Sequence, residues 1–275
     1  MLQSYRKCTD EPLPFAIIAD RENEYTSAFD DVVLLKNPTN SYLDKLFLAD
    51  LTPYHETVFI DADSLCISNP NKVFIDFKDC GDFSFYGCTL PFDNPNGWFD
   101  YKKCGEYKEK IHFSLSGHGG LYYIRRNDKS RRIAALARNL SENYYKYGFN
   151  FSNAPADEPV LAMAMAIEGS LPCNSMQPKI LFYPPNRTAL KVDRNGTINL
   201  NGKPEDVKIL HFGMANTPYF TYQWLHELIS HDYYLNDEKK QKKRYHIMKL
   251  QFLPNEIKTR CVYYTKKAIK RVIRK

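Results

Sequence analysis

Residues 57–64 read Thr-Val-Phe-Ile-Asp-Ala-Asp-Ser, an apolar run that stops at two carboxylates, Asp61 and Asp63. The run is short and rich in β-branched and aromatic residues, which is typical of a buried strand whose last residues emerge at the edge of a sheet. On an extended backbone the two acidic side chains project from the same side. The pattern therefore predicts a strand that delivers a pair of acids to a sheet edge.

Two carboxylates this close repel each other unless positive charge lies between them. The sequence has no Lys or Arg in residues 59–71, so a divalent cation is the usual solution. A plainer interpretation stays open, in which the strand is followed by an acidic turn that Asp63 caps, because short Asp-x-Asp matches are common.

The residues before the strand extend the pattern. Tyr42-Leu43-Asp44-Lys45-Leu46 leads through Thr52-Pro53-Tyr54 into the strand and its Asp-x-Asp. This order of a helix with a lysine, a Thr-Pro-Tyr turn, a strand and Asp-x-Asp resembles the nucleotide-sugar-dependent glycosyltransferases of the GT-A fold, most closely the family 8 type.

The resemblance implies a role for each residue around the motif. Asp61 and Asp63 would bind a metal, and Ala62 between them would lie against the donor. Lys45 would face the donor as a fixed positive charge. The family implies Mn²⁺, or less favourably Mg²⁺, since carboxylates, an imidazole and phosphate oxygens suit these cations.

Alternating strand and helix signals predict an α/β fold with a mostly parallel, Rossmann-like sheet and helices on both faces. Residues 13–20 and 31–35 are expected as strands, and Val73 and residues 83–86 continue the strand-rich pattern. The GT-A resemblance implies an earlier strand and helix. Residues 1–8 resemble the end of that helix, so its first strand is expected to be missing.

Residues 114–120 read Ser-Leu-Ser-Gly-His-Gly-Gly and precede an apolar strand at 121–124. Glycines let the backbone approach a ligand closely because no Cβ stands in the way. A flexible loop or β-bulge is an equally open interpretation. Family 8 enzymes carry an Asn-Ser-Gly element here, and the resemblance implies that His118, Gly119 and Gly120 take its place beside the donor.

Residues 128–147 are expected as a long helix, and a second helix follows a Pro-containing segment at 153–159. Asp157 is in place to act as an N-cap or first-turn acid, with Pro159 early in the helix. The resemblance adds a second interpretation, since family 8 enzymes have an acidic or Asp-Gln pair beside the reacting sugar. By order, Asp157 and Glu158 match that pair and are the expected catalytic residues.

Residues 193–196 and 201–202 predict a hairpin, and residues 207–213 a strand that ends in His211-Phe212-Gly213. A lone histidine after a strand is more often structural than a ligand. Family 8 enzymes, however, end their catalytic domain with a His-x-x-Gly-x-x-Lys-Pro-Trp element. The resemblance implies that His211 binds the metal and that Gly213 lies at the donor; the family's lysine is missing from residues 214–217.

The charge of the chain is uneven. Its net charge is +6, but residues 239–275 hold 14 Lys and Arg against the single acid Glu256, which is +13, and the other 238 residues hold 24 basic and 31 acidic residues, which is −7. We expect a catalytic domain at 1–236 and a basic amphipathic helical tail at 237–275, suited to an anionic membrane surface. Nucleic acid is a less favoured partner, and a solvated terminal helix stays open.

At 275 residues, with 20 Tyr and 17 Phe, the chain is long enough for one well-buried α/β core. No run approaches the roughly 20 apolar residues of a membrane span, and residues 1–7 lack the apolar segment of a signal peptide. The seven cysteines show no Cys-x-x-Cys spacing and indicate free thiols. These features predict a cytoplasmic protein. A second possibility, which the basic tail suggests, is that this cytoplasmic protein binds peripherally at the inner face of the membrane.

The expected function is metal-dependent transfer of a sugar from a nucleoside-diphosphate sugar to a glycan or lipid-linked acceptor, with retention of anomeric configuration. Two alternatives stay open. A haloacid-dehalogenase-type phosphatase also uses Asp-x-Asp, but normally near its N-terminus and with Thr or Val where Leu65 stands. A non-catalytic sugar- or nucleotide-binding protein is the other.

Overall fold

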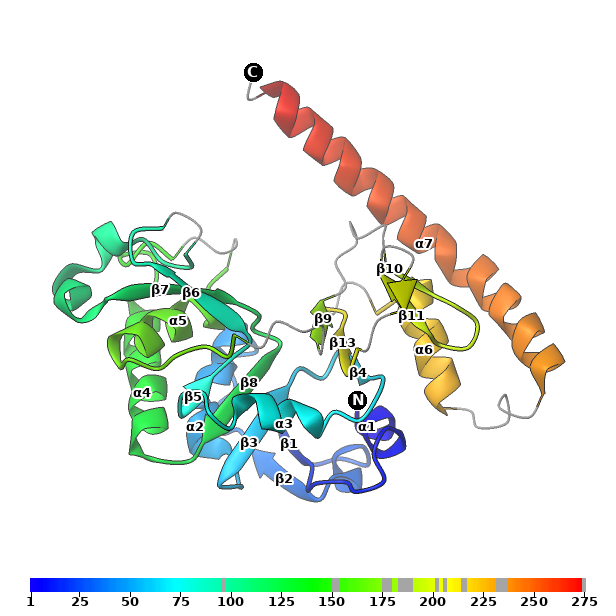
Figure 1. Cartoon of the computed structure of the whole chain (residues 1–275), viewed down its shortest axis with the longest axis horizontal. Coiled ribbons are helices and arrows are strands. Elements are labelled where there is room, and N and C mark those ends of the chain that lie inside the picture. Colours follow the sequence, from blue (N-terminus) through cyan, green and yellow to red (C-terminus); the bar gives the residue numbers. More distant parts are fainter. Residues whose placement is uncertain are drawn as a thin grey trace. The chain divides into compact units, whose positions relative to one another are not determined.

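The structure is a computed structural model that describes residues 1–94, 97–149, 154–174, 180–182, 190–200, 203–204, 207–213, 217–230 and 237–273. The chain forms two compact units (Figure 1). Unit 1 comprises Met1–Pro12, Asp61–Asn71 and Pro178–Lys275, and unit 2 comprises Leu13–Ile60 and Lys72–Gln177. Each unit has its own hydrophobic core. The sequence-based boundary at residue 237 stays a prediction.

The strands of unit 2 form three small sheets. The first pairs two parallel strands, the second has three antiparallel strands in the order β3-β8-β5, and the third is an antiparallel pair. The strands are β1 (Ala16–Ala19), β2 (Asp31–Leu34), β3 (Glu56–Ile60), β5 (Phe83–Ser84), β6 (Gly87–Pro91), β7 (Phe113–Gly117) and β8 (Leu121–Arg125).

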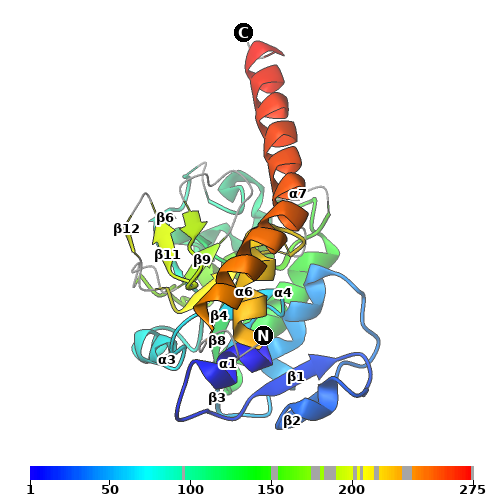
Figure 2. The same ribbon diagram turned by 90° about the vertical axis from the view of Figure 1, so that its right-hand side faces the viewer.

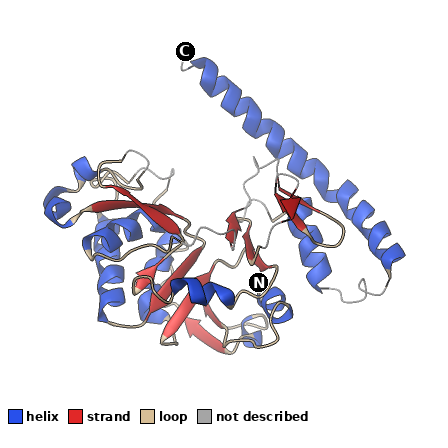
Figure 3. Ribbon diagram, in the orientation of Figure 1, coloured by secondary structure: helices blue, strands red, loops and turns tan. Residues whose placement is uncertain are grey.

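Helices pack against two of these sheets, the one formed by β3, β8 and β5 and the one formed by β6 and β7 (Figure 3). The α-helices are α2 (Leu48–Leu51), α3 (Lys72–Phe77), α4 (Asp128–Glu142) and α5 (Asp157–Ile167). The 3₁₀ helices are η1 (Thr26–Ala28), η2 (Tyr42–Phe47), η3 (Tyr101–Lys103) and η4 (Gly105–Lys110). Lys45 therefore lies on a 3₁₀ helix that runs directly into a short α-helix.

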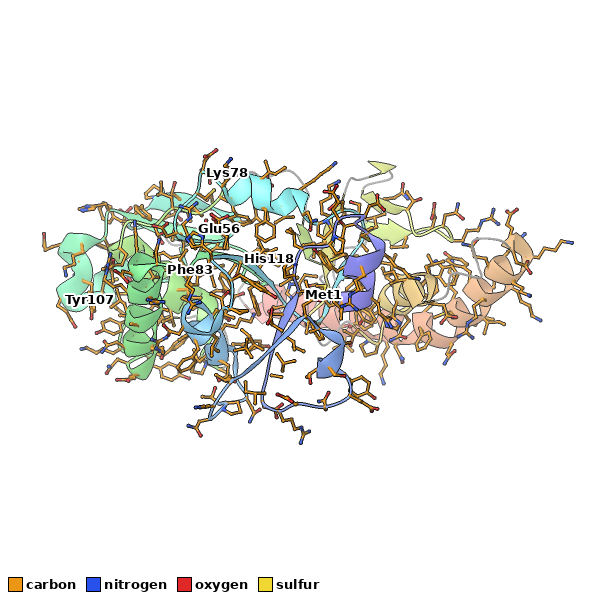
Figure 4. The ribbon with its side chains drawn as sticks, turned by 90° about the horizontal axis from the view of Figure 1, so that it is seen from below. Met1, Glu56, Lys78, Phe83, Tyr107 and His118 are labelled. Atoms are coloured by element: carbon orange, nitrogen blue, oxygen red, sulfur yellow. The ribbon has the colours of Figure 1, made fainter. Side chains whose placement is uncertain are left out.

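The core of unit 2 forms where α4 packs on α5. In α4 the buried side chains recur at helical spacing, at Ile133, Ala137 and Leu140, and Asn127 with Ser130 forms a capping box at its start. By contrast, α5 is buried on nearly all sides. Figure 4 shows the contrast between inside and surface, with Phe83 within the ribbon and Lys78 at its edge.

Unit 1 has a three-stranded sheet in the order β4-β13-β9, a second sheet in the order β10-β11-β12, and three helices. Its strands are β4 (Ser64–Cys66), β9 (Ile180–Phe182), β10 (Leu190–Val192), β11 (Ile198–Leu200), β12 (Lys203–Pro204) and β13 (Ile209–His211). Its helices are α1 (Leu2–Lys7), α6 (Phe220–Ser230) and α7 (Glu238–Ile273), and α6 packs against the first part of α7 (Figure 2).

The core of unit 1 is built around Trp224 of α6, which has no exposed surface. Its indole Nε1 donates a hydrogen bond of 3.1 Å to the backbone oxygen of Asp193, in the turn of the β10–β11 hairpin. Met248 and Tyr245 of α7 pack into the same cluster, and the Trp224 and Tyr245 rings are 5.1 Å apart. The indole thus ties the hairpin to both helices.

Most expected elements are confirmed, including the strands near 13–20, 31–35, 57–60 and 121–124 and the hairpin at 193–196. Two expectations about strands are wrong. Val73 lies in α3 rather than a strand, where Val73 and Phe77 are buried at the i, i+4 spacing of a helix. Among the described ladders only β1–β2 and β13–β9 are parallel, so the sheets are mixed rather than mostly parallel.

Other differences concern where elements end. The helix expected over 128–147 stops at Glu142, because Asn143 leaves helical geometry. The Asn143 N–H donates to the Leu140 oxygen, and the Tyr144 N–H donates to the Ser141 oxygen. Of the segments named in the sequence analysis, residues 153, 201–202 and 214–216 lie outside the described residues. Within the described part of the chain, no helix combines the length and apolar character that crossing a membrane requires.

Replacing Trp224 with Phe should lower the free energy of unfolding by about 2 kcal/mol, since it removes a buried hydrogen bond and leaves a small cavity. The matched control is Trp98→Phe, because Trp98 is the other tryptophan and is only partly buried in unit 2. Urea denaturation followed by circular dichroism measures both variants. Equal losses in the two variants would contradict the account of the core.

Candidate functional site

The paired acids lie between two strands of the chain. β3 ends at Ile60, the backbone turns at residues 61–63, and β4 begins at Ser64. The Ser64 N–H donates to the Asp61 oxygen at 3.1 Å, which closes the turn. The backbone is therefore not extended through the motif as expected, yet both carboxylates are held in one tight segment, with side chains 17% and 16% exposed.

His211 reaches the acids through a sheet ladder. β4 and β13 pair antiparallel in a register that sets His211 opposite Ser64. The Phe212 N–H continues the ladder and donates to the Asp63 oxygen at 3.2 Å. Backbone pairing thus places a histidine beside an acid nearly 150 residues earlier in the sequence.

The three side chains converge. His211 Nε2 lies 3.0 Å from Asp63 Oδ1 and 3.4 Å from Asp61 Oδ2, and one ligand atom from each residue lies within 4.8 Å of the others. Within the described residues this is the one group of three or more His, Cys, Asp or Glu side chains close enough to hold a metal ion. Two carboxylates and an imidazole form a donor set that fits Mn²⁺ or Mg²⁺.

Aromatic side chains border this group. The Phe212 and Tyr222 rings meet edge to face at 4.9 Å, and Tyr222 stacks on His226, one turn further along α6, at 5.9 Å. Burial raises the pKa of the Tyr222 hydroxyl, and the negative charge of Asp63 adds to the rise. Gly213 has a φ of 65°, a backbone conformation that favours glycine.

A second group of expected residues lies in unit 2, around the start of α5. Asp157 is its first helical residue and is 1% exposed. Its Oδ2 accepts a hydrogen bond of 2.5 Å from the Tyr122 hydroxyl and lies 3.7 Å from Lys45 Nζ. The Lys45 ammonium also donates to the Gly119 oxygen at 3.3 Å and lies 5.7 Å from the centre of the Phe59 ring.

Glu158 lies against the glycine-containing loop that joins β7 to β8. A Cβ added at Gly119 would fall 2.1 Å from the Glu158 Cγ, so only glycine fits there without displacing that side chain. The loop is ordered by two hydrogen bonds: the Gly120 N–H donates to His118 Nδ1 at 3.1 Å, and the His118 N–H donates to the Tyr86 oxygen at 2.9 Å. His118 is labelled in Figure 4.

All the expected site residues lie in the described part of the chain. Unit 1 holds Asp61, Ala62, Asp63, His211 and Gly213, and unit 2 holds Lys45, His118, Gly119, Gly120, Asp157 and Glu158. Ala62 is exposed in the turn between the two acids. The contacts group Asp61, Asp63 and His211 in one unit, and Lys45, Gly119, Asp157 and Glu158 in the other.

Sequence reasoning missed Tyr122, which is fully buried and hydrogen-bonded to Asp157. It stands in an apolar strand next to a second tyrosine, so its sequence context carries only a core signal. A buried tyrosine hydroxyl usually has a polar partner. A tyrosine within a predicted buried strand was therefore the one sign in the sequence that a polar group lies nearby.

Comparisons with known proteins place the fold. No family model matches the sequence, and no curated protein matches it. Two solved structures of the galactosyltransferase LgtC are similar to this chain, one in complex with donor and acceptor sugar analogues and one of an active-site mutant. They share 13% and 15% sequence identity with it, at TM-scores of 0.54 and 0.56.

Each similarity covers 83% of this chain and 89% of the neighbour, so it extends well beyond one motif. At this level of identity the comparison establishes the fold. The α/β fold expected from the strand order and the Asp-x-Asp context is confirmed, and the chain has the GT-A fold of the family 8 galactosyltransferase LgtC.

Proposed function

We propose that this protein is a metal-dependent glycosyltransferase, which moves a sugar from a nucleoside-diphosphate sugar to a glycan or lipid-linked acceptor. The observation that carries the proposal is the convergence of Asp61, Asp63 and His211 in a protein with the GT-A fold. The alternative is that His211 pairs with the two acids without a metal, and a measurement of metal binding distinguishes the two.

Sugar transfer from such a donor breaks the bond between C1 and the phosphate oxygen. Negative charge then develops on the departing diphosphate, and positive charge develops on the sugar ring. A divalent cation, with Mn²⁺ favoured over Mg²⁺, would be held by Asp61, Asp63 and His211 and would supply Lewis-acid stabilisation of the diphosphate. The partial burial of all three side chains strengthens such charge interactions by limiting water.

The proposal assigns the unit 2 residues to the sugar. Asp157 and Glu158 supply negative charge for the oxocarbenium-like carbon, and Lys45 supplies a fixed positive charge, as the family 8 resemblance implies. His118, Gly119, Gly120, Ala62 and Gly213 would form backbone or side-chain contacts with the donor. Retention of configuration is part of the proposal.

The proposal also includes association with an anionic membrane surface, at the inner face of the membrane in a cytoplasmic protein. α7 packs on the core of unit 1 through Tyr245, Met248 and Phe252. On the opposite side of the helix, Ile247, Leu250 and Ile257 are 44%, 80% and 51% exposed. Exposed Lys243 and Lys258 lie on the same side, and such an apolar stripe with basic flanks suits an anionic lipid surface better than nucleic acid.

Replacing Asp61 or Asp63 with Asn should abolish sugar transfer and leave the fold intact, because each change removes one anionic ligand. Mn²⁺ affinity, measured by titration calorimetry, should fall by about a hundredfold or more, since even the partners of metal ligands contribute 10–100-fold. Release of nucleoside diphosphate from a panel of UDP-galactose, UDP-glucose and GDP-mannose measures turnover, with and without a chelator.

Asp128→Asn is the matched control, since Asp128 is a first-turn acid of α4 whose side chain is 90% exposed and whose ion pair with Arg131 is 3.8 Å long. It should bind Mn²⁺ and turn over like the wild type. Undiminished turnover in Asp61→Asn or Asp63→Asn would remove the assignment of the metal site. A wild-type protein that binds Mn²⁺ but hydrolyses or transfers no sugar would instead favour the non-catalytic alternative.

Replacing Leu250 with Asp should weaken binding to vesicles that contain phosphatidylglycerol by about tenfold or more, because an exposed leucine that would insert into the lipid surface becomes a negative charge. Vesicle sedimentation measures the binding. Tyr145→Asp is the control, since Tyr145 is similarly exposed, at 70%, but belongs to unit 2. Equal binding by Leu250→Asp and wild type, or equal binding to neutral vesicles, would contradict the membrane role of α7.

A further inference from the structure

Two serine hydroxyls, those of Ser64 and Ser114, are buried without a hydrogen-bond partner among the described residues. Both residues are 0% exposed. A buried hydroxyl with no partner costs free energy, so such a group in a folded protein calls for an explanation. Ser64 directly follows the second acid of the candidate metal site, and the inference that follows rests on the metal dependence in the proposed function.

The ladder between β4 and β13 sets Ser64 opposite His211 (Figure 1). At the neighbouring pair, the Phe212 N–H donates to the Asp63 oxygen at 3.2 Å. Hydrogen-bonded and non-hydrogen-bonded pairs alternate along an antiparallel ladder, so Ser64 and His211 form a non-hydrogen-bonded pair, the kind in which opposite side chains lie closest. Such side chains share one face of the sheet, with Cβ atoms about 4.5–5.5 Å apart. The Ser64 hydroxyl is therefore a close neighbour of the imidazole that reaches the two acids.

The two faces of this sheet differ in polarity. The side chains that alternate with Ser64 and His211 along β4 and β13 belong to the hydrophobic core of unit 1: Leu65, Leu210 and Phe212. On the face of Ser64 and His211, the next opposite pair is Cys66 and Ile209, which are both buried. The hydroxyl thus lies at the one end of this face that adjoins the acids, where polar side chains gather.

A second buried serine beside β4 shows how a hydroxyl in these surroundings is satisfied. Ser4 of α1 is 1% exposed, and its Oγ donates to the Met1 oxygen at 2.6 Å and accepts the Cys66 N–H at 3.0 Å. Ser64 lies two residues before Cys66 on the same strand, and its hydroxyl has no such partner among the described residues. This contrast points to a partner that is not part of the polypeptide.

The chemistry of the metal site would supply such a partner. Asp61, Asp63 and His211 each offer one ligand atom, whereas Mn²⁺ and Mg²⁺ prefer about six ligands in octahedral geometry. About three positions are then left for other oxygen atoms, which come from water when the metal binds alone. A serine hydroxyl can accept a hydrogen bond from such a water, and it can donate one to a phosphate oxygen that takes the place of the water.

We infer that Ser64 is a positioning residue of the metal site, whose hydroxyl accepts a hydrogen bond from a water molecule that completes the coordination of the cation. Ser64 does not bind the metal itself, and it orients an oxygen ligand as the hydrogen-bond partners of metal ligands do. The hydroxyl therefore strengthens metal binding and destabilises the metal-free protein, in which it lacks this partner. A serine that only fills space would not produce these two opposite effects.

Replacing Ser64 with Ala tests both effects. In the presence of a chelator, the melting temperature of Ser64→Ala should be about 2 °C or more above that of the wild type, because the change removes an unpaired buried hydroxyl. The affinity for Mn²⁺, measured by titration calorimetry, should fall by about tenfold or more, since hydrogen-bond partners of metal ligands contribute about 10–100-fold. Circular dichroism establishes that the variant is folded.

Ser114→Ala is the matched control, because Ser114 of β7 is equally buried, has no hydroxyl partner among the described residues, and belongs to unit 2. It should gain a similar stability and bind Mn²⁺ with the affinity of the wild type. Equal Mn²⁺ affinities of Ser64→Ala and the wild type, or equal losses in the two variants, would overturn the inference. A lower melting temperature of Ser64→Ala in chelator would also overturn it, since the hydroxyl would then have a partner within the chain.

A crystal structure of the wild type with Mn²⁺ tests the contact directly. The inference expects an oxygen atom that is bound to the metal and lies about 2.5–3.0 Å from Ser64 Oγ. Direct coordination of the metal by Ser64 Oγ, or a hydrogen bond from it only to a water that the metal does not hold, would overturn the inference. If the wild type binds no Mn²⁺, the metal dependence of the proposed function fails together with this inference. Mn²⁺ binding that is equal in the wild type and Ser64→Ala refutes only the role of Ser64.

Discussion

The candidate metal site depends on one backbone pairing, the antiparallel ladder between β4 and β13. That ladder sets His211 opposite Ser64, and the Phe212 N–H extends it to the oxygen of Asp63. Backbone hydrogen bonds hold both ends of the group, so the convergence of the side chains follows from the sheet rather than from flexible contacts. A shift of register by one residue would turn His211 to the other face and separate it from the acids.

The acidic pair in unit 2 depends on a different kind of constraint. A tyrosine buried in an aromatic core holds Asp157, and a glycine makes room for Glu158. The candidate metal site and the acidic pair thus share one feature. In each, the polar side chains are held in place by well-packed structure, a sheet ladder in unit 1 and an aromatic core in unit 2. Such preorganisation lets a site stabilise developing charge without rearranging during the reaction.

The sequence, together with the family 8 resemblance, named side chains that the structure brings together, but it predicted the sheets around them less well. Apolar runs located the strands, the close carboxylates at 61 and 63 suggested a cation, and His211 was added to them only by the family 8 resemblance. Strand direction was missed because an apolar run reads alike in parallel and antiparallel pairing, and Val73 was missed because one turn of helix gives too little periodicity. Tyr122 was missed because its partner, Asp157, is 35 residues away.

The central claim is that Asp61, Asp63 and His211 grip one divalent cation. Crystals grown with Mn²⁺ and measured at the manganese absorption edge test it directly, because anomalous scattering locates the metal without reference to activity. The account predicts one strong peak, bound by the two carboxylates and His211 Nε2. The metal–ligand distances should be about 2.0–2.3 Å, the range typical of such ligands. A map with no peak there, and with His211 paired to both acids in the presence of the metal, would contradict it.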